Sequence, residues 1–155
     1  MDWPRVQKQD LTDVKNTFKS LKHEWIRHHY WELEFPKRVL NHAMRKGRIA
    51  LDGAVEKRLS QAVSLPKKQN PYDGRQTPFK GKAQTVITCA QHAVACCCRT
   101  CIEYWHGIPV DTPLSEEHVS YFKKLILMYI DERLPDLNAE PQAVPHLREG
   151  SNDEE

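Results

Sequence analysis

Long apolar runs are missing from this chain of 155 residues, since the longest, Leu125–Ile130, has only six. A transmembrane helix needs roughly 20 predominantly apolar residues, so we expect no membrane span. The first residues, MDWPRVQKQD, contain no apolar stretch after their charges, and this argues against a secretory signal. Internal repeats are also lacking, which excludes collagen and coiled-coil classes. We therefore expect a cytoplasmic protein with one globular domain, because domains commonly have about 100–150 residues.

Neither sign of charge dominates the whole chain, which has 23 basic and 21 acidic residues. The charges are nevertheless unevenly distributed. Residues 1–90 contain 18 Lys or Arg and 9 Asp or Glu, whereas residues 91–155 contain 5 and 12. A basic half can steer a polyanion to one face, and two oppositely charged halves can equally pack against each other. The charge balance alone does not establish nucleic-acid binding.

Apolar residues recur at helical spacing in most of the chain, which predicts a mainly α fold. The predicted helices cover residues 10–30, run from Pro36 to a stop at Gly47, continue to a point before Pro66, cover 89–105, and begin again at the Ser115 cap. Residues 85–88 are either one short strand or the approach to a helix. We predict a single small domain of four to five helices, with a long polar loop (66–82) beside the Cys/His-rich helix. Its parts are a basic, aromatic N-terminal helical extension (1–40), a Cys/His core (41–134) and an acidic, disordered tail (135–155).

All five cysteines lie within thirteen residues, flanked by two histidines, and such clustering is atypical of scattered core thiols. Without a secretory signal we expect reduced thiols and no structural disulfide. Zinc takes four thiolate or imidazole ligands in a tetrahedron. A continuous helix would hold His92 and His106 roughly 21 Å apart, too far to share one metal. One helix presents two ligands, His106 adds a third if the chain turns after Trp105, and a fourth must come from a histidine, a carboxylate, water or a second chain.

Two other interpretations of the cysteines stay open. Free cysteine packs well as a small apolar residue, so the thiols can be core residues. Alternatively, Cys98 and Cys101 form a C-x-x-C pair with Arg99 beside it, which is typical of redox or nucleophilic thiols. Catalytic pairs of this kind usually lie at a helix N-terminus, and here we expect the pair inside a helix.

The polar loop contains a second candidate motif, DGRQTP at residues 73–78. Asp73-Gly74 is a strong turn signal. Arg75, Gln76 and Thr77 offer a guanidinium fork, an amide and a hydroxyl, which suit a phosphate, a carboxylate or a base edge. The alternative is that Asp73 and Thr77 only cap the turn.

The combination of DGRQTPFKG with AQHAVACCCRTCIEYWHGIP resembles a family of short prokaryotic proteins that constitute a domain of unknown function. Its members pair a DG[K/R]QTP loop with a QHAxAxCCRxCxxxWHGIP segment, and the resemblance covers roughly Met44 to Arg133. Cys89 and Cys96 lie outside the motif, so the resemblance favours the other three cysteines. It implies no established activity. The motif positions are Asp73, Gly74, Gln76, Thr77, Gln91, His92, Cys97, Cys98, Arg99, Cys101, Trp105, His106 and Gly107.

Together these observations predict a small zinc-binding protein that binds nucleic acid or a nucleotide. The predicted metal ligands are Cys97, Cys98, Cys101, His106 and His92. The predicted substrate or nucleic-acid residues are Asp73, Arg75, Gln76, Thr77, Arg99, Lys37, Arg38, Arg45, Lys46 and Arg48, with Lys15, Lys19, Lys22 and Arg27 as further phosphate contacts.

Two alternatives come from other classes. One is a metal- or thiol-dependent enzyme that uses the Cys/His cluster, with the loop as a substrate clamp. The other is an accessory subunit that docks on a larger ribonucleoprotein or defence complex.

Overall fold

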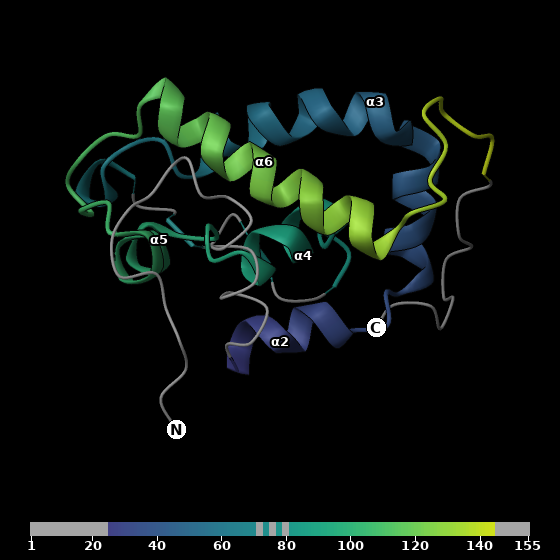
Figure 1. The fold of residues 1–155 in the computed structure, drawn as a ribbon, viewed down its shortest axis with the longest axis horizontal. Helices are drawn as coiled ribbons and strands as arrows, with labels where there is room; N and C mark the ends of the chain where they lie inside the picture. The colour runs from purple at the N-terminus through teal and green to yellow at the C-terminus, as the bar shows by residue number, and fades with distance from the viewer. Residues whose placement is uncertain (1–24, 71–72, 75–76, 79–80, 145–155) are drawn as a thin grey trace.

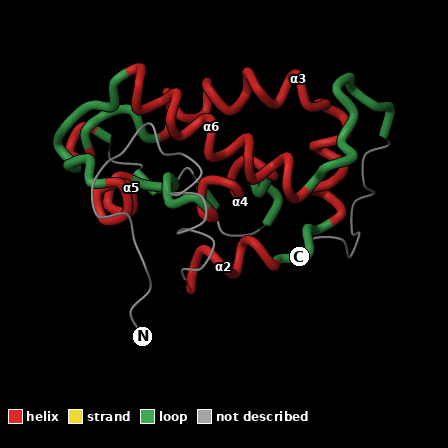
Figure 2. Tube along the Cα trace, in the orientation of Figure 1, coloured by secondary structure: helices red, strands yellow, loops and turns green. Residues whose placement is uncertain are grey.

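The computed structural model describes residues 25–70, 73–74, 77–78 and 81–144, and the part it describes consists of helices joined by loops and turns (Figure 2). Its elements are α2 (Trp25–Glu32), α3 (Lys37–Ala62), the short 3-10 helix η1 (Lys67–Gln69), α4 (Val86–Ala93), α5 (Arg99–His106) and α6 (Glu116–Arg133). No strand occurs among these residues, which confirms the mainly α prediction. Within the predicted first helix, residues 10–24 lie outside the described residues.

Helix α4 is the centre of the fold, because every one of its eight residues is buried. It contacts α2, α3 and α6, and Figure 1 shows α3 and α6 on one side of it and α2 on the other. Thr85 caps its first turn through a reciprocal pair of hydrogen bonds with Thr88. Residues 85–88 are therefore the start of a helix and not a strand.

Helix α3 changes direction at Gly47, where φ is 80° and ψ is 158°. Only glycine adopts this backbone conformation readily. The change of direction lets the chain after α6 lie against α3, where Arg48 N–H donates to the carbonyl of Asn138 at 2.9 Å and Gln142 N–H donates to that of Met44 at 2.9 Å. In the tail that we predicted to be disordered from residue 135, residues 137–142 take part in backbone hydrogen bonds, while 145–155 lies outside the described residues.

Helix α6 begins as predicted at Ser115, which caps it together with His118. Its last turn attaches α2 to the core. The Tyr129 hydroxyl donates to the Tyr30 carbonyl at 2.6 Å, and the Arg133 guanidinium donates to the same carbonyl at 2.6 Å while lying 4.1 Å from the centre of the Phe35 ring. These contacts attach α2 and the residues that follow it to the last turn of α6. Within the described residues, no helix has both the length and the apolar character required to cross a bilayer.

Candidate metal centre

Three of the five cysteines come together where α4 is joined to α5. The sulfur atoms of Cys97, Cys98 and Cys101 all lie within 4.8 Å of one another. Cys97 is buried, whereas Cys98 and Cys101 are partly exposed. Sulfurs that share one zinc at 2.3 Å in a tetrahedron are about 3.8 Å apart, so only small side-chain movements separate this arrangement from a metal-bound one. The cluster could hold a metal ion.

The backbone between α4 and α5 creates this cluster. Helix α4 ends in a Schellman motif, in which Cys96 N–H donates to the Gln91 carbonyl at 2.9 Å and Ala95 takes a left-handed conformation with φ of 61°. The chain then enters α5 at Cys98, whose sulfur accepts the N–H of Cys101 at 3.4 Å. The prediction of one helix over 89–105 is therefore wrong. Glycine or proline usually marks such a break, and neither occurs here.

This break changes the setting of the C-x-x-C pair. Cys98 is the N-cap of α5 and Cys101 lies in its first turn, so both thiols are at the positive end of the helix dipole. We expected the pair inside a helix, which argued against thiol chemistry. The structure removes that argument.

Arg27 of α2 reaches this cluster from a distant part of the sequence. Its side chain is only 5% exposed. Nη1 donates to the His92 carbonyl at 2.8 Å and lies 3.9 Å from the Cys97 sulfur, while Nη2 donates to the Cys101 sulfur at 3.3 Å. We expected Arg27 among the phosphate contacts on a polar helix face, and its burial against the cysteines contradicts this. No local sequence pattern indicates a contact across 74 residues.

The three thiols share their protons unequally. Hydrogen bonds from Cys97 and Cys98 lower the pKa of Cys101, and the Arg27 guanidinium lowers it further. Hydrogen bonds with Cys101 and Cys98 raise the pKa of Cys97, and its burial raises it further. The metal-free cluster therefore favours a thiolate on Cys101, and thiolate is the form that binds metal.

The DGRQTP loop holds the backbone on both sides of Cys98. The Asp73 carboxylate accepts the Arg99 N–H at 3.0 and 3.2 Å, just after Cys98. The Thr77 hydroxyl donates to the Cys97 carbonyl at 3.1 Å. These two predicted substrate residues therefore position the cysteines, and Arg75 and Gln76 lie outside the described residues.

Arg99 belongs to the same support. Its side chain is completely buried, and its guanidinium donates to the carbonyls of Leu65, Pro109 and Thr112 at 2.9, 2.8 and 2.5 Å. A buried guanidinium needs such acceptors, because an unsatisfied buried charge is costly. Arg99 thus joins the start of α5 to the chain segments on either side of it, and its guanidinium, which was predicted to bind a substrate, is engaged by these carbonyls.

The two predicted histidine ligands do not join the sulfur cluster. His106 is fully buried, and its Nε2 donates to the Val94 carbonyl at 3.0 Å while Nδ1 accepts from the Tyr121 hydroxyl at 3.2 Å. Burial lowers the pKa of His106 to about 4. His92 Nε2 donates to the Thr77 carbonyl at 3.0 Å, and its ring stacks on Tyr30 at 4.9 Å. Both rings therefore pack and bond as neutral imidazoles beside the cluster.

Comparison with protein-family models identifies the domain. The model of the domain of unknown function DUF4186 matches residues 15–131, which is most of the chain. This protein belongs to the DUF4186 family. The match begins ahead of residue 41, where the sequence motifs predicted the core to start, and it includes Arg27 and the whole cysteine cluster. No solved structure matches the chain.

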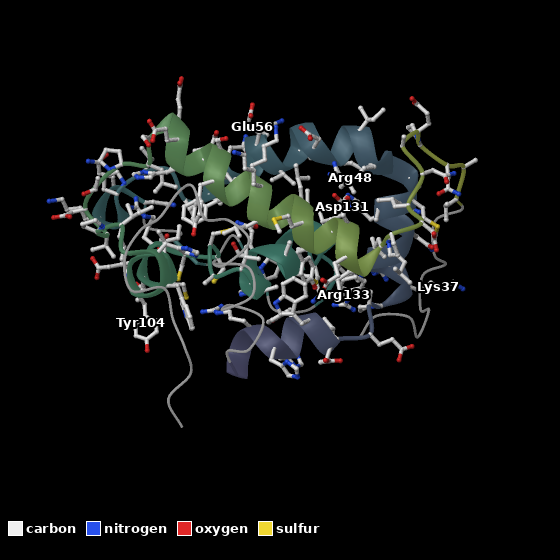
Figure 3. The ribbon with its side chains drawn as sticks, in the orientation of Figure 1. Lys37, Arg48, Glu56, Tyr104, Asp131 and Arg133 are labelled. Atoms are coloured by element: carbon white, nitrogen blue, oxygen red, sulfur yellow. The ribbon has the colours of Figure 1, made fainter. Side chains whose placement is uncertain are left out.

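The basic residues predicted to contact phosphates lie along α3 of this DUF4186 domain. Lys37 and Lys46 are exposed, and Arg38 and Arg45 are partly exposed. Arg48 instead forms a two-pronged ion pair with Asp131 of α6 at 2.6 and 3.1 Å (Figure 3). Arg48 therefore links two helices of this domain, and nucleic-acid binding by the other four stays a prediction.

Proposed function

We propose that this protein binds zinc through Cys97, Cys98 and Cys101. The observation that carries the proposal is the convergence of three sulfurs at one helix junction, with Arg27 donating to two of them. Thiolates select soft or borderline ions such as Zn²⁺ and Cu(I), whereas Mg²⁺ and Ca²⁺ prefer oxygen ligands. Three thiolates and a divalent ion carry one net negative charge, which the Arg27 guanidinium balances.

The surroundings of the cluster suit a metal centre. Outer groups that hydrogen-bond to metal ligands fix their orientation and commonly affect affinity 10- to 100-fold. Here Arg27 bonds to the sulfurs, and Thr77 and Asp73 bond to the backbone groups just before and just after Cys98. A bound ion would therefore tie together α2, the polar loop and the start of α5.

The metal content of untagged protein tests this proposal directly. We expect about one zinc per chain, and we expect alkylation of the clustered thiols only after a chelator has removed it. Single Cys97→Ala, Cys98→Ala and Cys101→Ala variants should lose most of the zinc. Cys89→Ala is the matched control, because Cys89 is buried outside the cluster. Protein without metal, or equal zinc loss in the control, would contradict the proposal.

A second candidate function is thiol–disulfide exchange, which the location of Cys98 and Cys101 at the start of α5 favours. The Cys101 thiolate would attack one sulfur of a small disulfide and form a mixed disulfide, releasing one thiolate. Cys98, after losing its proton to solvent, would attack the Cys101 sulfur and release the second. Two electrons would thereby pass from the protein dithiol to the substrate, leaving a Cys98–Cys101 disulfide.

An aromatic disulfide that releases a coloured thiolate distinguishes this candidate. Metal-free protein should release two thiolates per reacting Cys101, and the Cys98→Ala variant should stop at one. If the variant also releases two, Cys98 is not the resolving thiol. If the metal-free protein reacts no faster than an unstructured cysteine peptide, the second candidate fails.

A further inference from the structure

We infer that a metal held by Cys97, Cys98 and Cys101 keeps a fourth coordination position open to solvent, where it takes an exchangeable neutral donor. The inference rests on the proposed function and deepens it. Structural zinc sites are closed by four protein ligands, whereas sites that bind a substrate or activate water have three and an open position. Which class this centre belongs to decides what it can do chemically.

The polar groups nearest to the cluster already have partners of their own. In the described part of the chain, no other histidine, cysteine or acidic side chain joins the three sulfurs. The Asp73 carboxylate accepts the Arg99 N–H, His92 donates to Thr77, and both nitrogens of His106 are used. Recruiting the Asp73 carboxylate or either nitrogen of His106 would break an existing buried or half-buried hydrogen bond, which costs about 1–3 kcal/mol.

The accessible side of the cluster faces outward along α5. Cys97 is buried beneath it, and Cys98 and Cys101 are partly exposed. Thr100, between these two, is exposed. Tyr104, one turn after Cys101, is 58% exposed and projects away from the body of the molecule (Figure 3). A small donor can therefore approach a bound ion from the solvent side.

The charges around the cluster favour a neutral donor over an anion. Three thiolates are balanced by a divalent ion and Arg27, so an added anion leaves a net negative centre. The Asp73 carboxylate beside Cys98 does not change this balance, because the Lys67 ammonium, which donates to the Thr100 hydroxyl at 2.6 Å, offsets its charge. Water would occupy the position at rest, and a neutral nitrogen donor of the imidazole class would displace it.

Cobalt(II) in place of zinc tests the inference, because its absorption spectrum reports coordination. Titration of the cobalt-loaded full chain with imidazole should shift the spectrum saturably, at concentrations at least roughly tenfold below those at which thiocyanate acts. The Cys89→Ala variant should respond as the wild type does, because its cluster is intact.

Three other outcomes of the titration are possible, and each overturns a different part of the inference. Cobalt that binds but shows no change with either probe means a closed, four-ligand centre, and the inference fails while the proposed function stands. Thiocyanate acting at concentrations equal to or lower than those of imidazole overturns the preference for a neutral donor. Failure of the wild type to bind cobalt or zinc overturns the proposed function and the inference with it.

Discussion

Arg27 is the residue whose environment most strongly links the cysteine cluster to the rest of the fold. It is buried, it bonds to two sulfurs and to the His92 carbonyl, and it supplies the positive charge closest to three ionisable thiols. A side chain in this position affects both the protonation of the thiols and the charge of any metal complex they form. At the residue scale, the protonation of the cysteine cluster therefore depends on an arginine that is outside the motif containing the cysteines.

Replacing Arg27 with Gln should weaken zinc binding about 10- to 100-fold, as expected for the loss of a group that orients and neutralises the ligands. In the metal-free protein the pKa of Cys101 should rise, so its alkylation at neutral pH should slow. Competition with a chromophoric chelator and the pH profile of alkylation measure the two effects. His28→Gln, on an exposed neighbour, is the control. Unchanged zinc affinity with an intact thermal transition would contradict this role.

The burial of His106 leads to a second prediction at the residue scale, which concerns how the free energy of unfolding depends on pH. Its pKa is lowered from 6.5 in the unfolded chain to about 4 in the folded one, because burial disfavours the imidazolium. The unfolded state therefore binds the proton more readily, and the stabilisation present above pH 6.5 is lost as the pH falls towards 4. Urea unfolding between these pH values should show stability falling by about 3 kcal/mol.

A His106→Gln variant should show a flatter dependence, whatever its absolute stability. Equal slopes in the two proteins would mean that another group causes the acid sensitivity.

At the element scale, the important features are the ends of helices and the connections between them. The Schellman motif ends α4, the Cys98 cap starts α5, and the bend at Gly47 gives the chain after α6 a surface to lie on. Each feature satisfies backbone groups that a helix end would otherwise leave without partners. The cysteine cluster exists because two helices meet there, and not because one helix presents a stripe of thiols.

The bend in α3 predicts opposite effects for two glycine substitutions in the same helix. A Cβ at Gly47 would lie 2.7 Å from the Ala139 carbonyl oxygen and would occupy a backbone conformation with φ of +80°. Gly47→Ala should therefore cost about 1–3 kcal/mol or more in the free energy of unfolding. At Gly53 nothing lies within 4 Å, so Gly53→Ala should stabilise the helix by about 0.5–1 kcal/mol. Urea denaturation of both variants checks the pair, and a neutral Gly47→Ala would contradict the packing of residues 137–142 on α3.

At the scale of the whole molecule, charge is organised within the fold as well as along the sequence. Pairs between α3 and α6 join the two halves of the chain. Arg48 of the basic half pairs with Asp131, and Lys123 of the acidic half pairs with Asp52, with atoms 2.6 and 2.8 Å apart. Such exposed pairs contribute little to stability individually. They do reduce the basic surface that is left to attract a polyanion.

The predicted binding of nucleic acid is therefore tested best by its salt dependence. If Lys37, Arg38, Arg45 and Lys46 contact phosphates, the affinity for single-stranded DNA should fall steeply with salt, and Lys46→Ala should lower the salt slope by about one unit. Fluorescence anisotropy at several salt concentrations measures this. Lys124→Ala on α6 is an exposed control of the same charge change. Binding that is insensitive to salt, or no binding at low salt, would contradict the prediction.

The sequence by itself determined the helical class, an interruption at Gly47, the Ser115 cap and the choice of Cys97, Cys98 and Cys101 as candidate metal ligands. These features depend on local spacing, caps and motif residues, which short-range physics controls. Tertiary structure alone decided that α4 ends before the three clustered cysteines and that Arg27 bonds to two of them. It also decided that His92 and His106 form hydrogen bonds elsewhere. The left-handed backbone conformation at Ala95 could not be predicted, because glycine is the residue that usually marks such a position. The contacts of Arg27 span more than 60 residues and depend on how the helices pack. The local sequence pattern therefore identified the candidate thiols, and the packing of distant segments arranged them into the candidate metal centre.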